Sequence, residues 1–197
     1  PTKGHQSNTM ANGLMKYMID QGDDYKIRFI NRLDMNTTGI LLVGKNAYCQ
    51  EDFARQASSG KVEKKYLAIV AGSVGEDNGT IDLPVGKPLA DDIKRAVIPE
   101  GYPSVTHYEV IERFEKGYTL LRVLLETGRT HQIRVHLSHL GYPIVGDVLY
   151  GRENPELIGR QALHAEQLGF DHPVTGERLS FLAPLPSDVE ELLLRIR

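Results

Sequence analysis

The chain has 197 residues, of which 41% are hydrophobic and 25% charged, the fractions of an ordinary globular protein. This length suits one substantial domain and is short for two. The longest apolar runs are only as long as a strand, which predicts no membrane span, and the formal net charge of −3 argues against a simple nucleic-acid-binding module, which is usually basic. The single cysteine, Cys49, cannot form an internal disulfide and favours a reducing, cytoplasmic location.

Helical and extended patterns alternate in the first third of the chain. Apolar residues at helical spacing predict a helix over residues 8–21, with Ser7 or Asn8 as its N-cap and Gly22 as its stop. The next predicted elements, in chain order, are a strand at Tyr25–Ile30, a strand at Gly39–Val43, a helix from Asn46 to Ser58 ended by Gly60, and a strand at Lys65–Val70.

Hairpins dominate the remainder. Residues 73–103, rich in Gly, Asp and Pro, are predicted as loops with short strands near Thr80–Val85 and Ile93–Val97. Two hairpins are predicted next: one joins Val105–Glu112 to Tyr118–Leu125 through the turn Phe114–Gly117, and the other joins Ala162–Phe170 to Arg178–Ala183 through His172–Glu177. A helix over 130–140, ended by Gly141, lies between the two hairpins. A last helix over 188–196 is predicted with Ser187 as its N-cap. The pattern predicts one α+β domain over residues 1–197, with a mainly antiparallel mixed sheet and flanking helices.

A polar loop precedes one of the apolar strands. In Asn31–Gly39, Asp34 stands two residues after Arg32 and before an Asn-Thr-Thr-Gly turn, and the apolar run 40–43 follows. This order places one carboxylate on a loop at the edge of a sheet, where chemistry is often carried. A salt-bridged structural turn accounts for the same residues about equally well.

The helix over 130–140 would place an arginine at the edge of the core. Arg134 shares a stripe with Thr130 and Ser138. The neighbouring apolar stripe, predicted to face the core, consists of Ile133, Leu137 and Leu140. A guanidinium at such a border needs a carboxylate or phosphate partner. A local glutamate could supply this partner, as could a catalytic carboxylate or a substrate.

The sequence has no motif for a zinc site, a serine nucleophile or a phosphate-binding loop. Three histidines, at 131, 136 and 139, do not provide the three or four converging ligands of a zinc site, so no metal is expected. Neither a nucleophile elbow around a serine nor a phosphate-binding glycine loop before a helix occurs. Tyr66, in the strand with Leu67 and Ile69, buries its ring and needs a partner for its hydroxyl, which also fits an ordinary core tyrosine.

Four segments together resemble, in order, the RluA family of pseudouridine synthases. They are Asn31–Gly39 for the catalytic motif, Lys64–Ala68 for the motif with the stacking tyrosine, Thr127–Leu137 followed by Gly141–Asp147 and Tyr150-Gly151 for the third, and Leu163–Ala165, His172–Glu177 and Ala183–Pro186 for the C-terminal segment. Asn31 stands where the family usually has His, and Gly44 replaces the commoner Ala. The resemblance implies the pseudouridine synthase fold, with an active-site cleft across the sheet.

The resemblance also implies an activity. The chain would be an isomerase that converts specific uridines to pseudouridine in structured RNA, with ribosomal RNA favoured over transfer RNA. Asp34 would be the catalytic aspartate, as nucleophile or base, while Tyr66 would stack on the flipped base and Arg134 would pair with Asp34 and keep it ionised. Because substrate and product are isomers, no cofactor is expected. A cytoplasmic monomer is expected.

The resemblance also implies which residues contact RNA. Arg32 resembles the family's arginine that enters the space left by the base, and Arg129, with Thr130 and His131, is expected to contact RNA. Residues 127–152 carry three arginines against one aspartate, so a locally basic surface is compatible with the acidic total. Because many relatives have more chain at this end, the start at Pro1 predicts that an N-terminal strand, and a small RNA-binding domain in some relatives, precede this segment.

Two other classes of function stay open at this point. One is a catalytically silent RNA-binding module on the same fold, although such a module has little use for Asp34, Tyr66 and Arg134 together. The other is a carboxylate-dependent nucleosidase or glycosidase, which needs a second carboxylate near the first. Glu126 or Asp147 would have to be brought to Asp34 by folding.

Overall fold

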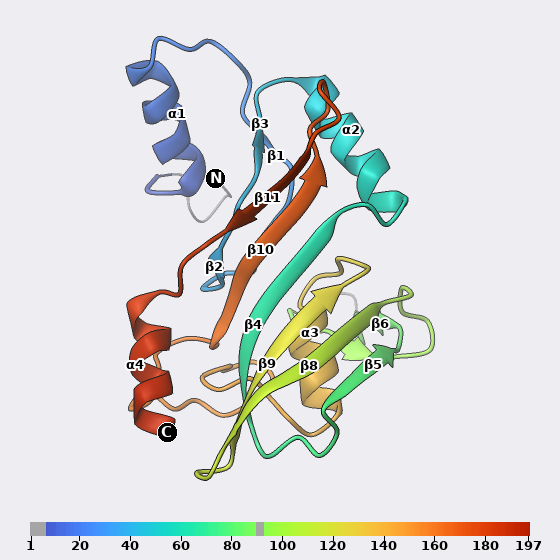
Figure 1. Ribbon diagram of the computed structural model, residues 1–197, viewed down its shortest axis with the longest axis vertical. Helices are drawn as coiled ribbons and strands as arrows, with labels where there is room; N and C mark the ends of the chain where they lie inside the picture. The colour runs from blue at the N-terminus through green and yellow to red at the C-terminus, as the bar shows by residue number, and fades with distance from the viewer. Residues whose placement is uncertain (1–6, 90–92) are drawn as a thin grey trace. The chain divides into compact units, whose positions relative to one another are not determined.

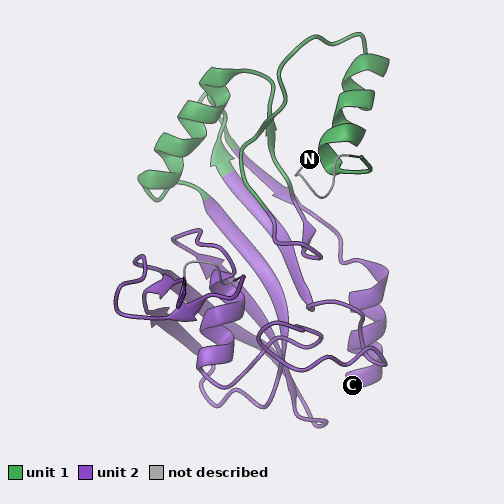
Figure 2. Cartoon of the chain, turned by 180° about the vertical axis from the view of Figure 1, so that it is seen from behind, with its two compact units in different colours: residues 1–32, 41–62, 170–178 green, residues 33–40, 63–169, 179–197 purple. Residues whose placement is uncertain are grey.

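The computed structural model describes residues 7–89 and 93–197 (Figure 1). The chain forms two compact units, drawn in different colours in Figure 2: one takes the described residues of 1–32, 41–62 and 170–178, the other those of 33–40, 63–169 and 179–197. Within the described residues, no helix is both long enough and apolar enough to cross a bilayer.

The first unit contains two helices, α1 (Met10–Asp20) and α2 (Ala47–Ser58). The prediction for α2 is confirmed, because Asn46 Oδ1 accepts the Cys49 amide at 2.9 Å at its start. The N-caps predicted for α1 are wrong, since Thr9 is its N-cap and forms a reciprocal capping box with Asn12. Asn8 has a positive φ of 57°, whereas Thr9 has the extended backbone that an N-cap requires. The predicted stop is confirmed, because Gly22 follows the C-cap residue with a positive φ of 70°.

The two strands predicted before and after the Asp34 loop are wrong in extent. Only β1 (Arg28–Phe29) forms in the first, and the second divides into β2 (Thr38–Gly39) and β3 (Val43–Gly44). β3 pairs with β1, whereas β2 pairs with a different sheet. Asn31 Oδ1 accepts the Leu42 amide at 2.7 Å, so an asparagine side chain replaces a ladder bond there.

A seven-stranded sheet forms the centre of the second unit's fold (Figure 1). Its strand order is β11 (Arg178–Leu182), β10 (Leu163–Asp171), β4 (Glu63–Ala71), β9 (Tyr118–Leu125), β8 (Val105–Phe114) and β5 (Asn78–Asp82), with β2 beside β10. The β2–β10 pair is parallel, and the pairs β10–β4, β4–β9, β9–β8 and β8–β5 are antiparallel. The predicted α+β class with a mainly antiparallel mixed sheet is confirmed.

In the loop-rich region, the strand predicted near Thr80–Val85 is divided between the end of β5 and a further short strand, and the strand predicted near Ile93–Val97 is shorter than predicted. β6 (Val85–Gly86) and β7 (Ala96–Val97) form a two-residue antiparallel ladder. The helix α3 (Gln132–His139) packs against β7 and β8. Ile133 and Leu137 face the core as predicted, whereas Leu140 is 40% exposed because the helix has already ended there.

The last helix, α4 (Ser187–Ile196), packs Val189, Leu192 and Ile196 into the core. Its predicted N-cap is wrong: Pro186 occupies that position and Ser187 is already helical, without a side-chain cap. Proline's fixed φ suits this extended position. Asp188 and Glu190 in the first turn complement the helix dipole instead.

Gly39 is the point at which the Asp34 loop meets β10. Its φ is +117°, and a Cβ there would lie 2.2 Å from the Ala165 carbonyl oxygen. We therefore expect Gly39→Ala to lower the free energy of unfolding by about 3 kcal/mol, because it adds overlap to a backbone that L-residues avoid. Urea unfolding measures this change. Gly13→Ala in α1, where a Cβ meets nothing within 4 Å, is the control and is expected to raise stability by up to about 1 kcal/mol; equal effects would contradict the prediction.

Candidate active site

The loop that carries Asp34 is held by hydrogen bonds to its backbone. The Thr37 amide donates to the Asp34 carbonyl at 3.0 Å, and Asn36 adopts a left-handed φ of 68°. Gln161 Nε2 donates to the Met35 carbonyl at 2.6 Å and to Thr37 Oγ1 at 3.1 Å. These bonds fix the turn without using the Asp34 carboxylate.

Two further side chains secure the same loop. Arg160 Nη1 donates to the Asn36 carbonyl at 3.2 Å, and the Arg160 guanidinium is itself paired with Asp188 through two bonds of 2.7 and 2.8 Å. Thr38 Oγ1 lies 2.9 Å from His164 Nδ1, beside the parallel pairing of β2 with β10. The loop is therefore anchored at both ends of its turn.

The start of α3 is built around a buried glutamine. Gln132 Oε1 accepts the Arg129 amide at 3.0 Å and the Thr127 hydroxyl at 2.9 Å. Its Nε2 donates to the Val105 carbonyl at 3.0 Å and to Thr106 Oγ1 at 2.9 Å. All polar atoms of this side chain serve to fix the turn that leads into the helix, so the first turn of α3 is rigidly placed.

Arg134, in that first turn, lies between two aspartates. Its Nε and Nη2 donate to the two carboxylate oxygens of Asp147 at 2.7 and 2.8 Å, and its Nη1 donates to Asp34 Oδ2 at 3.3 Å. Asp147 is fully buried, whereas the Asp34 side chain is 15% exposed. The predicted pairing of Arg134 with Asp34 is present, and the alternative of a local glutamate is wrong, because the structural partner is Asp147.

The two aspartates determine the direction in which the pKa of Arg134 is shifted. Burial by itself lowers the pKa of Arg134, but hydrogen bonds and charge from Asp147, and then Asp34, outweigh it, so the pKa is raised. Asp147 Oδ1 also accepts the amides of Leu149 and Tyr150 at 3.0 and 3.2 Å, which occupies that carboxylate completely. Of the two aspartates, only Asp34 is open to a substrate.

Tyr66 lies on β4, opposite Val123 of β9, with its side chain half-buried. Burial first, and the negative charge of Asp34 second, raise the pKa of Tyr66 to about 12. The phenol is therefore protonated near neutral pH, and Tyr66 lies within electrostatic range of Asp34. Of the three residues predicted to be catalytic, Arg134 and Asp34 are therefore in direct contact, and Tyr66 is near enough to be affected by the charge of Asp34.

A further aromatic residue backs the arginine. The Arg134 guanidinium carbon lies 5.1 Å from the centroid of the Tyr150 ring. The Tyr150 hydroxyl accepts the Arg95 amide at 2.7 Å and lies 2.7 Å from His131 Nδ1, to which it can donate its own hydrogen. Burial is the main cause that lowers the pKa of His131. A neutral imidazole with Nδ1 as acceptor fits both observations.

Comparison with known proteins identifies the family of this chain. The family model described as RNA pseudouridylate synthase matches residues 1–139. The chain belongs to the RNA pseudouridylate synthase family. The resemblance to RluA-type pseudouridine synthases is thereby confirmed. Among relatives, the chain is 44% identical to the Bacillus subtilis (strain 168) uncharacterized RNA pseudouridine synthase YlyB, covering 100% of this chain and 66% of that protein.

A second relative carries a more specific name. The Pseudomonas aeruginosa protein named ribosomal large subunit pseudouridine synthase D is 41% identical, over 100% of this chain and 65% of that protein. The chain thus spans just under two thirds of the length of both curated relatives. The solved structure of human RNA pseudouridylate synthase domain containing 1 has a TM-score of 0.72 at 31% identity, over 95% of this chain and 81% of that one. The structure of human RNA pseudouridylate synthase domain containing 4, with a TM-score of 0.78 at 24% identity, shows the same fold.

The residues that the family resemblance assigned to RNA binding are more exposed than Arg134 and Asp147. Arg129 is exposed, with its guanidinium 5.3 Å from the Tyr102 ring centroid. Thr130 is partly buried, and His131 has a left-handed φ of 60° at the N-cap of α3. Arg32 is exposed and belongs to the first unit. Their contacts with RNA stay a prediction.

Sequence reasoning did not identify Tyr150, Gln161 or Arg160 as supports of the candidate site, and it considered Asp147 only as a possible second carboxylate. Asp147 and Tyr150 stand in a segment that resembled the family, so their presence was visible but their partners were not. Gln161 and Arg160 lie more than 120 residues from the loop that they hold, and no local pattern links them to it. Among residues 7–89 and 93–197, no three His, Cys, Asp or Glu side chains converge as a metal site would require.

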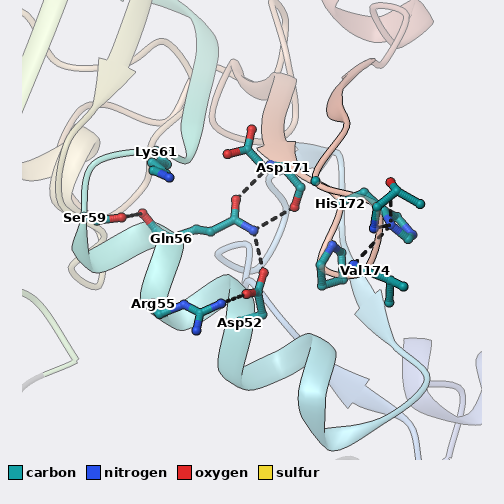
Figure 3. A pocket seen from close by; sticks show the side chains of 11 residues that line it. Asp52, Arg55, Gln56, Ser59, Lys61, Asp171, His172 and Val174 are labelled. Carbon is teal, nitrogen blue, oxygen red and sulfur yellow. Dashed lines mark hydrogen bonds and ion pairs between the residues drawn. The ribbon is translucent and has the colours of Figure 1, made fainter.

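A separate pocket of about 550 Å³ lies in the first unit, between the C-terminal half of α2 and residues 171–176 (Figure 3). Figure 3 shows Gln56 joining its two walls: its Nε2 donates to the Asp171 carbonyl at 2.7 Å and to Asp52 Oδ2 at 2.6 Å. Its Oε1 accepts the Asp171 amide at 2.8 Å. The buried polar atoms of Gln56 are satisfied within the protein, which indicates a structural role in joining the helix to the strand.

Proposed function

We propose that this chain isomerises uridine to pseudouridine in ribosomal RNA, with Asp34 as its catalytic group. The observation that carries the proposal is the Asp34–Arg134–Asp147 cluster, in which one partly exposed carboxylate is bonded to a buried arginine that a second carboxylate holds from behind. Family membership supports the reaction, and the relative named for the large ribosomal subunit supports the RNA class.

Substrate and product have the same composition. The bond between ribose C1′ and uracil N1 breaks, the uracil rotates and C1′ bonds to C5. C5 then gives up its proton to solvent, and N1 takes up one proton from solvent. Whether Asp34 attacks the sugar or removes a proton from it, the reacting group is its carboxylate, which the 3.3 Å bond from Arg134 Nη1 holds in place. The cluster therefore suits either course, with no redox or group-donor cofactor required.

Tyr66 is suited to hold the displaced base. A base within a helix must leave its stack before it reacts, which costs a few kcal/mol. Stacking on an aromatic side chain returns about 1–3 kcal/mol per base. Since the Tyr66 phenol is protonated near neutral pH, its ring presents no charge to the uracil. Arg32, Arg129, Thr130 and His131 are proposed to contact the surrounding RNA.

The alternatives have weaker support. A glycosidase needs a second available carboxylate, but both oxygens of Asp147 are occupied by Arg134. Glu126 is 60% exposed and lies 2.6 Å from His107 Nε2. A silent RNA-binding module would have no need for a buried arginine aimed at a partly exposed aspartate. The single catalytic domain over residues 1–197, the monomeric state and the cytoplasmic location stay predictions.

Tritium release from RNA labelled at uridine C5 tests the proposal directly. We expect this chain to release tritium from ribosomal RNA faster than from transfer RNA at equal uridine concentration. Release only from transfer RNA would overturn the choice of substrate class. RNA binding without any release would favour the silent module, and release of free uracil would favour the nucleosidase.

A further inference from the structure

A lysine that the proposed mechanism does not use lies on the same strand as Tyr66. Lys64 precedes Tyr66 by two residues on β4, so the two side chains leave the same face of the sheet, about 7 Å apart along the strand. Lys64 Nζ is 3.7 Å from the position that a Cβ on Gly128 would occupy. The ammonium group therefore lies beside the turn that carries Arg129, Thr130 and His131.

This ammonium group has no protein partner among the residues that the structure describes. Burial lowers its pKa, and no described carboxylate counteracts that effect. Its neighbour Lys65, whose side chain leaves the opposite face, pairs with Glu63 at 2.5 Å. Lys64 is partly buried, so its ammonium has lost part of its hydration and gains from a nearby negative charge. The arrangement indicates that an anion from outside the chain completes the site.

We propose that Lys64 binds a backbone phosphate of the RNA, next to the nucleotide that stacks on Tyr66. This inference rests on the proposed function, which places a uridine against Tyr66. A phosphate suits the site because an ammonium binds it as a point charge from any direction, and partial burial weakens the screening of that pair. Lys64 is thus a substrate-binding residue, distinct from the catalytic Asp34 cluster.

The salt dependence of RNA binding tests the assignment. For Lys64→Met we expect the slope of log K against log salt concentration to fall in magnitude by about 0.7–1, the value for one lost phosphate contact. Binding at low salt is expected to weaken about tenfold, and KM to rise by a similar factor with kcat changed less than about twofold. Lys65→Gln, the matched control on the opposite face, is expected to keep the parent's slope.

The melting temperature of the free protein separates binding from structure. Because Lys64 has no partner among the described residues of the free protein, Lys64→Met is expected to melt at or above the parent's temperature. A lower melting temperature with an unchanged salt slope would show a structural role and overturn the inference, as would equal slopes for both variants.

The proposed function can fail independently of this inference. If the parent binds RNA without releasing tritium while Lys64→Met still lowers the slope, the phosphate site stands and the proposed activity falls. If the parent binds neither ribosomal nor transfer RNA, both are overturned.

Discussion

Asp34→Asn is expected to abolish tritium release from ribosomal RNA, with a loss of at least about 10⁴-fold, the scale on which removal of a principal catalytic group acts. The amide can neither attack the sugar nor accept its proton. Arg134 keeps both bonds to Asp147, so the buried guanidinium is not left unpaired. We therefore expect the free energy of unfolding to change by only about 1–2 kcal/mol.

Glu126→Gln provides the matched control for that variant. Its carboxylate is mostly exposed and pairs with His107, so its loss is expected to leave tritium release within about twofold of the parent. Both proteins would be compared by single-turnover tritium release and by RNA binding. An Asp34→Asn variant that retains more than about one hundredth of the parent's rate would remove Asp34 from the catalytic role.

Asp147→Asn is expected to have the largest effect on stability, about 3–5 kcal/mol, because it leaves a buried guanidinium without its paired negative charge. Asp147 is fully buried and also accepts the amides of Leu149 and Tyr150, so no water can replace the lost charge. Freed from its partner, Arg134 would lose the orientation that directs Nη1 to Asp34. We expect at least a hundredfold fall in kcat from this misplacement.

Asp188→Asn tests whether burial of the ion pair is the reason for the large loss of stability expected for Asp147→Asn. Asp188 also forms two bonds to an arginine, Arg160, but its side chain is 45% exposed. The expected loss there is at most about 1 kcal/mol. Urea unfolding of the two variants gives the comparison, and similar losses for Asp147→Asn and Asp188→Asn would show that Asp147 is not the anchor of Arg134.

Local patterns predicted the parts of the fold that depend on neighbouring residues. The α2 helix begins at Asn46 because its cap bond reaches only three residues along the chain. The β8–β9 hairpin turns where the sequence has glycine, and Gly117 has a positive φ of 80° there. By contrast, the apolar run after Asp34 joins two different sheets, and alternation within one segment cannot indicate which partner strand each residue will meet.

For the candidate site, the sequence by itself indicated the three residues proposed for catalysis, and the tertiary structure decided how they are supported. Asp34, Tyr66 and Arg134 were recognisable because their motifs are short and local. The pairing of Arg134 with Asp147, the bonds of Gln161 and Arg160 to the Asp34 loop, and the place of Lys64 beside the turn at Gly128 depend on segments that meet only on folding. Burial sets the strength of these contacts, and burial is a property of the packed chain rather than of any single segment.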